Sequence, residues 1–181
     1  MNRTRIILTS VAAAGAGVIG VGAVAAAHDG GGAPKRLTGY QEVPALSTPG
    51  VGEFRASLSP GGDAIDYRLS FSGLETAATQ AHIHFENKTN NGAIVVFLCS
   101  NLGNGPAGTP ACPAEGTVSG TITPAQVIGP AAQGIAAGEF AELVRALRAG
   151  AAYANVHTTT FTAGEIRGQI GADDDDHHGR D

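Results

Sequence analysis

Short runs of alternating apolar and polar residues follow one another along most of the chain. The clearest run is 64–71, in which four apolar side chains alternate with polar ones: Ile65, Tyr67, Leu69 and Phe71. A period of two is typical of a strand with one buried face and one solvated face. Turn-forming residues, such as Pro49-Gly50 and the segment 59–63, separate neighbouring runs. The pattern therefore predicts antiparallel strands joined by short turns.

About eight strands are expected, at 37–43, 52–58, 64–71, 80–86, 93–99, 116–122, 151–158 and 164–170. The run 93–99 (AIVVFLC) is the most apolar after residue 27, which favours a central, buried strand paired with 80–86 in a hairpin. Apolar residues recur at helical spacing over 139–148, and Gly150 follows as a stop. The segment 123–138 is rich in Ala, Gly and Pro and is expected to be irregular. We predict a mainly β domain, an antiparallel β-sandwich or barrel with one short helix near 139–148.

The two ends of the chain differ from this domain in composition. Residues 1–27 have a basic start, an apolar run and the small residues Ala25-Ala26-Ala27, a pattern typical of a signal peptide. The alternative is an uncleaved anchor, since a spanning helix needs roughly 17 to 25 residues. We expect 28–35 to be a flexible linker, 36–171 the folded domain and 172–181 a disordered acidic tail. The protein is thus expected to be secreted, periplasmic or attached to the cell envelope.

Net charge and cysteines limit the partners. The net charge is −5, and without the two arginines of the leader it is −7, so neither nucleic acid nor an anionic membrane is an expected partner. An extracellular or envelope partner of unknown identity stays open. The two cysteines, Cys99 and Cys112, predict a disulfide in an exported protein, rather than free thiols or metal ligands. Closing a loop of this size is worth about 3 kcal/mol in the chain-entropy model.

Two histidines one residue apart carry the main chemical signal. His82 and His84 share one face of the expected strand 80–86, about 7 Å apart, a gap that two imidazoles can span to reach one ion. His157 lies on another expected strand, on a polar face opposite small apolar residues, and would supply a third nitrogen. Three imidazoles suit Zn(II) or Cu(II). The competing interpretation is a hydrogen-bonded polar patch in which the histidines are structural.

Other polar residues are candidates for supporting these ligands. If the strand 164–170 lies beside 151–158, Glu165 or Arg167 would hydrogen-bond the imidazoles and orient them. His28, next to a new N-terminus, and His177-His178 in the tail are weaker metal candidates, and we interpret them as incidental. There is no nucleophile elbow, Walker loop, dinucleotide fingerprint or CxxC pair. No catalytic residue is assigned, and we lean towards a protein that is not an enzyme.

Four segments of the chain, in order, resemble the CHRD domain, first described in chordin: 37–44 (LTGYQEVP), 81–84 (AHIH), 153–158 (YANVHT) and 164–170 (GEIRGQI). The resemblance implies an exported β-rich domain, often found alone in bacterial proteins, whose biochemical role is mostly undefined. It also implies that the family's polar motif positions are Glu42, His82, His84, Asn155, His157, Glu165 and Arg167.

A weaker similarity connects the chain to copper/zinc superoxide dismutase, through an H-x-H strand, a late histidine and a Gly-rich strand with an arginine. That family's bridging histidine has no counterpart, because no histidine lies between His84 and His157. Three hypotheses follow. The first is a module that binds copper, zinc or a polar ligand through the three histidines. The second is an adhesion module with structural histidines, and the third is a copper oxidoreductase.

Overall fold

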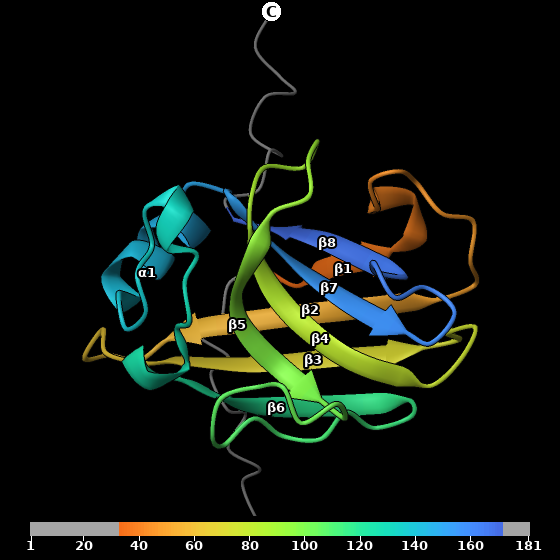
Figure 1. The fold of residues 1–181 in the computed structure, drawn as a ribbon, viewed down its shortest axis with the longest axis horizontal. Coiled ribbons are helices and arrows are strands. Elements are labelled where there is room, and N and C mark those ends of the chain that lie inside the picture. The colour runs from red at the N-terminus through yellow and green to blue at the C-terminus, as the bar shows by residue number, and fades with distance from the viewer. Residues whose placement is uncertain (1–32, 172–181) are drawn as a thin grey trace, which may run out of the picture.

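The structure is a computed structural model and describes residues 33–171 (Figure 1). Its eight strands are β1 (Lys35–Thr38), β2 (Val51–Leu58), β3 (Ile65–Ser72), β4 (Ala78–Phe85), β5 (Ala93–Ser100), β6 (Gly116–Ile122), β7 (Ala152–Thr158) and β8 (Ile166–Ile170). They form one antiparallel sheet in the order β5-β4-β7-β8-β1-β2-β3-β6. The sheet curls until its two end strands, β5 and β6, lie against each other. The predicted mainly β fold is confirmed, as a nearly closed barrel.

The alternating residues fill the inside of this barrel. In β3, Leu69 pairs across the sheet with Phe54 of β2 and with Val118 of β6, and all three are buried. On the opposite wall, Ile83 of β4 and Val156 of β7 are fully buried in the same core. Burying apolar side chains from every wall is worth about 25 cal/mol per Å² of apolar surface. The polar face of each strand is thereby directed away from the barrel interior.

β5 is buried as predicted but is not central, so that part of the prediction is wrong. It pairs with β4 alone, and its other edge is covered by the irregular segment 123–138, where the Ile128 N–H donates to the Val95 carbonyl at 2.9 Å. Two register shifts against β4 leave Val95 and Leu98 as extra residues, which explains the unbroken burial from Val95 to Cys99.

The predicted disulfide between Cys99 and Cys112 is present and fastens the loop after β5.

Three segment predictions differ from the structure in detail. The expected strand 37–43 ends at Thr38 and continues as a 3-10 turn, Gly39–Gln41, whose Gly39 lies so close to Thr48 that a Cβ atom would be 2.5 Å from it. The chain thus turns away from the sheet to form a loop over its outer face. The last strand starts at Ile166 rather than 164, and 123–138 contains two short 3-10 turns, Pro124–Gln126 and Ala131–Gln133.

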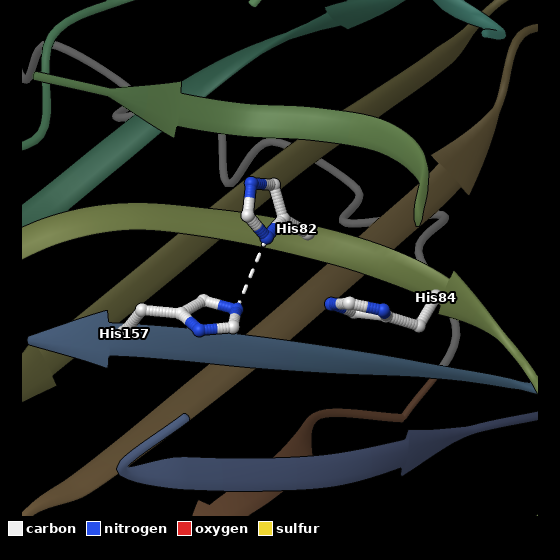
Figure 2. A group of neighbouring side chains, drawn as sticks. All are labelled: His82, His84 and His157. Carbon is white, nitrogen blue, oxygen red and sulfur yellow. Dashed lines mark hydrogen bonds between the residues drawn. The ribbon is translucent and has the colours of Figure 1, made fainter. Parts of the chain in front are cut away.

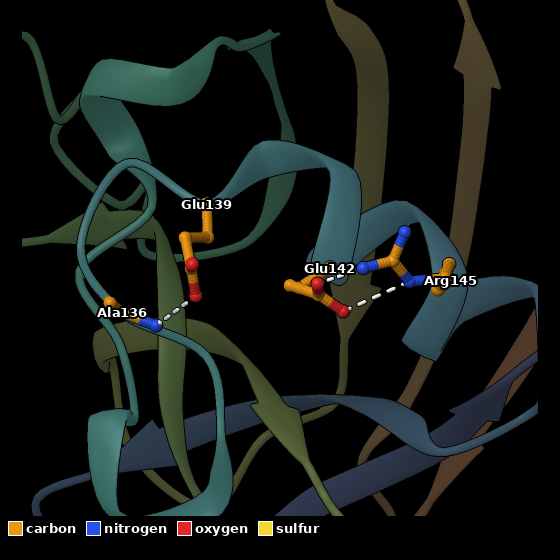
Figure 3. Close-up of polar contacts among 4 residues, drawn as sticks. All are labelled: Ala136, Glu139, Glu142 and Arg145. Atoms are coloured by element: carbon orange, nitrogen blue, oxygen red, sulfur yellow. Dashed lines mark hydrogen bonds and ion pairs between the residues drawn. The ribbon is translucent and has the colours of Figure 1, made fainter.

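The helix α1 (Phe140–Arg148) covers the end of the barrel where β2 finishes and β3 begins (Figure 1). Phe140, Leu143 and Ala146 point into the core. On the outer side Arg145 pairs with Glu142, while the carboxylate of Glu139 accepts from the Ala136 N–H at 2.7 Å just before the helix starts (Figure 3). The predicted helix is therefore present, and its apolar stripe holds it against the barrel.

The expectations for the ends of the chain fall largely outside the described residues. The predicted signal peptide at 1–27, most of the linker at 28–35 and the acidic tail at 172–181 lie outside the described residues, while β1 already starts at Lys35. Among residues 33–171, no helix has the length and apolarity needed to cross a membrane.

Replacing Leu143 should show how much the helix depends on its buried stripe. Leu143 is fully buried, so Leu143→Ala is expected to lower the free energy of unfolding by about 2–5 kcal/mol. Leu102→Ala is the control, because Leu102 is 56% exposed and its truncation should change stability by less than about 0.5 kcal/mol. Urea unfolding followed by circular dichroism measures both. Equal losses in the two variants would contradict this assignment of the core.

Candidate metal site

The pairing of β4 with β7 brings the three histidines together. His82 lies opposite Asn155 and His84 opposite Tyr153, which places His157 diagonally next to His82 on the face turned away from the core. Figure 2 shows the rings of His82, His84 and His157 converging from the two strands. One ligand nitrogen from each lies within 4.8 Å of the other two. The structure thus forms the three-histidine cluster that the sequence predicted.

Backbone carbonyls fix the tautomers of two rings. The Nδ1–H of His84 donates to the Gly92 carbonyl at 3.0 Å, and the Nδ1–H of His157 donates to the Thr162 carbonyl at 3.0 Å. A carbonyl oxygen only accepts, so each ring carries its hydrogen on Nδ1 and keeps a lone pair on Nε2. This is how ligand histidines are oriented in known metal sites. Both Nε2 atoms are therefore ready to bind an ion.

The third ring, His82, completes the group through Nδ1. This atom lies 3.1 Å from Nε2 of His157, which has a lone pair, so Nδ1 of His82 donates its hydrogen there. The Nε2 atoms of His82 and His84 are buried and have no hydrogen-bond partner among residues 33–171. Buried polar atoms are rarely left without a partner. The unpaired nitrogen of His84 faces the other two histidines and indicates that a further atom belongs between them.

Burial also keeps the rings in the form that a metal needs. Desolvation lowers the pKa of His82 to about 2, helped by the neighbouring His157 and His84. It lowers the pKa of His84 to about 4, against the opposing effect of the bond to the Gly92 carbonyl, and it lowers the pKa of His157 as well. All three imidazoles are neutral at pH 7. No proton has to be removed from a charged ring before an ion binds.

The spacing of the nitrogens is close to that of a metal site. Bonds of about 2.0–2.1 Å at tetrahedral angles place two ligand nitrogens about 3.3 Å apart. Nδ1 of His82 and Nε2 of His157 are 3.1 Å apart, which is close to this spacing, and one ring nitrogen of each histidine lies within 4.8 Å of the other two.

Arg167 acts on the site through Tyr153 and not through a hydrogen bond to an imidazole, so that prediction is wrong. Its guanidinium lies 3.4 Å from the centre of the Tyr153 ring, and the His84 ring is stacked on the same tyrosine with ring centres 4.8 Å apart. The guanidinium donates to the carbonyls of Asn87 and Asn90 at 2.9 and 3.0 Å and to the Asn91 side chain at 3.2 Å. Arg167 therefore fastens the loop 86–92, whose last carbonyl orients His84.

Glu165 does not hydrogen-bond a histidine either, and the corresponding prediction is wrong. Its fully buried carboxylate accepts from the hydroxyls of Thr48 and Thr158 at 2.6 and 2.8 Å and from the Glu75 N–H at 2.8 Å. Glu165 directly precedes β8, at a point where two loops approach the end of β7. Its carboxylate oxygens accept hydrogen bonds from three donors there. It joins those loops to the sheet instead of orienting an imidazole.

The remaining polar motif residues, Glu42 and Asn155, form a separate contact beside the cluster. The Asn155 amide donates to the Glu42 carboxylate at 2.6 Å. Burial raises the pKa of Glu42 to about 7, although Arg167 and the Asn155 bond act in the opposite direction. Gly164 lies against both side chains: a Cβ there would be 2.5 Å from the Asn155 amide and 2.8 Å from Glu42.

Three features of the site were missed from the sequence. Tyr153 and His157 are four residues apart in β7, so a period of two puts them on the same face, and this spacing is the signal that could have identified Tyr153. The carbonyls of Gly92 and Thr162 carry no side-chain signal at all, because any residue offers a backbone carbonyl.

Comparison with known proteins agrees with the motif resemblance. A family model described as CHRD domain matches residues 34–170. The chain belongs to the CHRD family. Its match covers every strand, the three histidines and the loops that hold them, so the cluster lies in the CHRD domain itself. No curated protein and no solved structure is significantly similar to the chain, and the resemblance to superoxide dismutase therefore has no support from these comparisons.

Gly164 should tolerate alanine less well than a glycine with open space around it, because a methyl group at Gly164 would meet two polar side chains of this CHRD site. Gly164 has φ +129° and Gly134 has φ +91°, so alanine is strained by about 1–2 kcal/mol at either position. Only at Gly164 does the new methyl group also collide with neighbours, whereas nothing lies within 4 Å at Gly134. Overpacking of this kind adds about 1–3 kcal/mol. Urea unfolding should show the larger loss for Gly164→Ala; equal losses would contradict the close packing described here.

The raised pKa of Glu42 predicts a pH-dependent effect of Glu42→Gln. Between pH 4.5 and about 7 the folded protein keeps a proton on Glu42 that the unfolded chain has lost, so the wild type loses stability as pH rises. Glutamine stays neutral, and the stability of the variant relative to the wild type should rise over this range, by up to about 1.4 kcal/mol per pH unit. Because the two proteins share every other titrating group, the difference isolates Glu42. Parallel pH profiles would contradict the prediction.

Proposed function

We propose that this CHRD domain binds one transition-metal ion, Cu(II) or Zn(II), through Nδ1 of His82 and Nε2 of His84 and His157. The observation that carries the proposal is the pair of carbonyl-fixed tautomers that direct Nε2 lone pairs of His84 and His157 to one side, in a site that leaves a buried His84 nitrogen without a partner. A cluster of purely structural histidines would not need this common direction.

The donor set favours these two metals. Three neutral imidazoles suit zinc and copper in their divalent forms, whereas iron–sulfur clusters require thiolates. The two cysteines are joined to each other and supply no thiolate. Among residues 33–171 no carboxylate is hydrogen-bonded to the rings, so the ligand set would be nitrogen alone, with a fourth position for water or another small ligand.

The burial of the cluster supports a structural or storage role. His82 is fully buried, and His84 and His157 are 8% and 6% exposed. An ion there would connect β4 with β7 and, through the rings, with the carbonyls of Gly92 and Thr162 in two loops. Such an ion stabilises the folded state in proportion to its affinity. We further propose that the domain works outside the cytoplasm, since its disulfide fits an oxidising compartment and residues 1–27 have the pattern of a signal peptide.

One observation favours the alternative, an adhesion module with structural histidines. His82 and His157 hydrogen-bond each other at 3.1 Å, so part of the cluster is satisfied without a metal. In that case the three rings serve only to pack β4 against β7, and the partner is a protein that contacts another surface of the domain. Metal measurements on the purified protein decide between the two.

The test uses residues 28–181 without an affinity tag, in a background in which His28, His177 and His178 are replaced by glutamine. These three histidines are outside the described residues, and replacing them removes any contribution of their own to metal binding. Titration calorimetry with Cu(II) and with Zn(II) should show one site. The midpoint temperature of thermal unfolding should rise, because an ion at a free concentration of 100 times Kd adds about 2.7 kcal/mol to the free energy of unfolding.

His84→Ala in the same background should abolish both the calorimetric signal and the thermal shift, because it removes one ligand and leaves the His82–His157 pair. The background protein itself is the matched control, since it has lost three histidines and should bind fully. The metal proposal would be contradicted if the His84→Ala variant still bound one equivalent of the ion, or if the background protein bound none.

A further inference from the structure

A second candidate site lies at the end of the barrel that α1 covers. A cavity of about 330 Å³ opens there, lined by residues of the helix and of β2, β3 and β8. Its wall is apolar, with side chains that include Phe54, Ala56 and Leu58 of β2 and Val144 and Leu147 of α1. Mouths of β-barrels are a frequent place for ligand pockets. No residue of this cavity belongs to the histidine cluster.

We propose that this cavity binds a small single-chain amphiphile, with the hydrocarbon chain inside and an anionic head group at Arg148. The inference is independent of the proposed metal function, because it concerns other residues at another face of the domain.

The apolar wall is incompletely covered by the protein itself. Leu143 is fully buried under the helix, yet Val144 and Leu147, its neighbours on the apolar stripe, are only half-buried, and Leu58 at the end of β2 is 38% exposed. Val144, Leu147 and Leu58 line the cavity. A hydrocarbon chain placed there would remove their surface from water, which is favourable in proportion to the apolar area buried.

The charges at the rim select the head group. Lys35 and Arg148 are the charged residues that line the cavity, and both are cationic, although the whole chain has a net charge of −5. No hydrogen bond or ion pair joins the Arg148 side chain to another residue of 33–171. Its guanidinium is therefore available to a carboxylate or phosphate, with which arginine forms paired hydrogen bonds.

The size of the cavity limits the ligand to a short chain. Pockets for drug-sized ligands range from roughly 300 to 1,000 Å³, and this cavity is at the lower end of that range. A lipid with two long chains would not fit. The competing occupant of the rim is the chain's own Asp173–Asp176, which follows the rim residue Gly171 in the sequence.

Decanoate, used below its micellar concentration, is a suitable probe for residues 28–181. Titration calorimetry should show one decanoate per chain and at least about tenfold weaker binding of decanol and decyltrimethylammonium, because each lacks the charge-assisted contact at the rim. Ala56→Phe, which fills the cavity, should abolish binding. If that variant does not fold, Leu147→Glu, which puts an anion on the helix side of the wall, should abolish binding instead.

Two arginines of the same helix provide the matched comparison. Arg148→Gln should weaken decanoate binding about tenfold. Arg145→Gln should leave it unchanged, since Arg145 pairs with Glu142 and does not line the cavity. Equal binding of the three probes, no binding of any, equal effects of the two arginine variants, or decanoate binding that is seen only in a chain ending at Gly171 would each overturn the proposal. The last result would identify the acidic tail as the occupant.

Discussion

The antiparallel pairing of β4 with β7 is the constraint on which the candidate metal site depends. This pairing places Asn155 opposite His82 and Tyr153 opposite His84. His157 is therefore the diagonal neighbour of His82. A slip of one residue would turn a strand's side chains to the other face, and the histidines would enter the apolar core while Ile83 and Val156 faced the loops. The cost of burying neutral imidazoles in place of those aliphatic side chains makes the observed register strongly preferred.

Loops, rather than a second sheet, bury the outer face of these strands. A buried arginine is costly unless its donors are paired. Arg167 is 1% exposed, and its donors contact two carbonyls and an amide of the loop 86–92. The same loop ends at Gly92, where the carbonyl orients His84 and the N–H donates to the Tyr153 hydroxyl at 3.1 Å. The loop 86–92 thus both pairs the buried donors of Arg167 and orients His84.

Period-two alternation was sufficient to predict the faces of the strands and hence the shared face of the three histidines. It did not reveal how Glu165 and Arg167 act, because their partners include backbone groups and loop residues far away in sequence. For Arg167 these are carbonyls of Asn87 and Asn90, about 80 residues earlier, and no side-chain pattern identifies a carbonyl acceptor. β5 was expected to be central for a related reason. Hydrophobicity reports burial, and burial beneath the segment 123–138 is indistinguishable in sequence from burial between two strands.

Two rings of the three-histidine cluster already have the tautomers that an ion would need, and the remaining change of tautomer would fall on His82. The tautomers of His84 and His157 are those that a bound metal requires, so neither ring has to lose or move a hydrogen. In His82 the hydrogen on Nδ1 would move to Nε2, and the 3.1 Å bond to His157 would be exchanged for two metal–nitrogen bonds. Because burial keeps every ring neutral, this exchange involves no competition with protons at pH 7. The buried Nε2 of His84, which has no hydrogen-bond partner among residues 33–171, would gain a partner in such an ion.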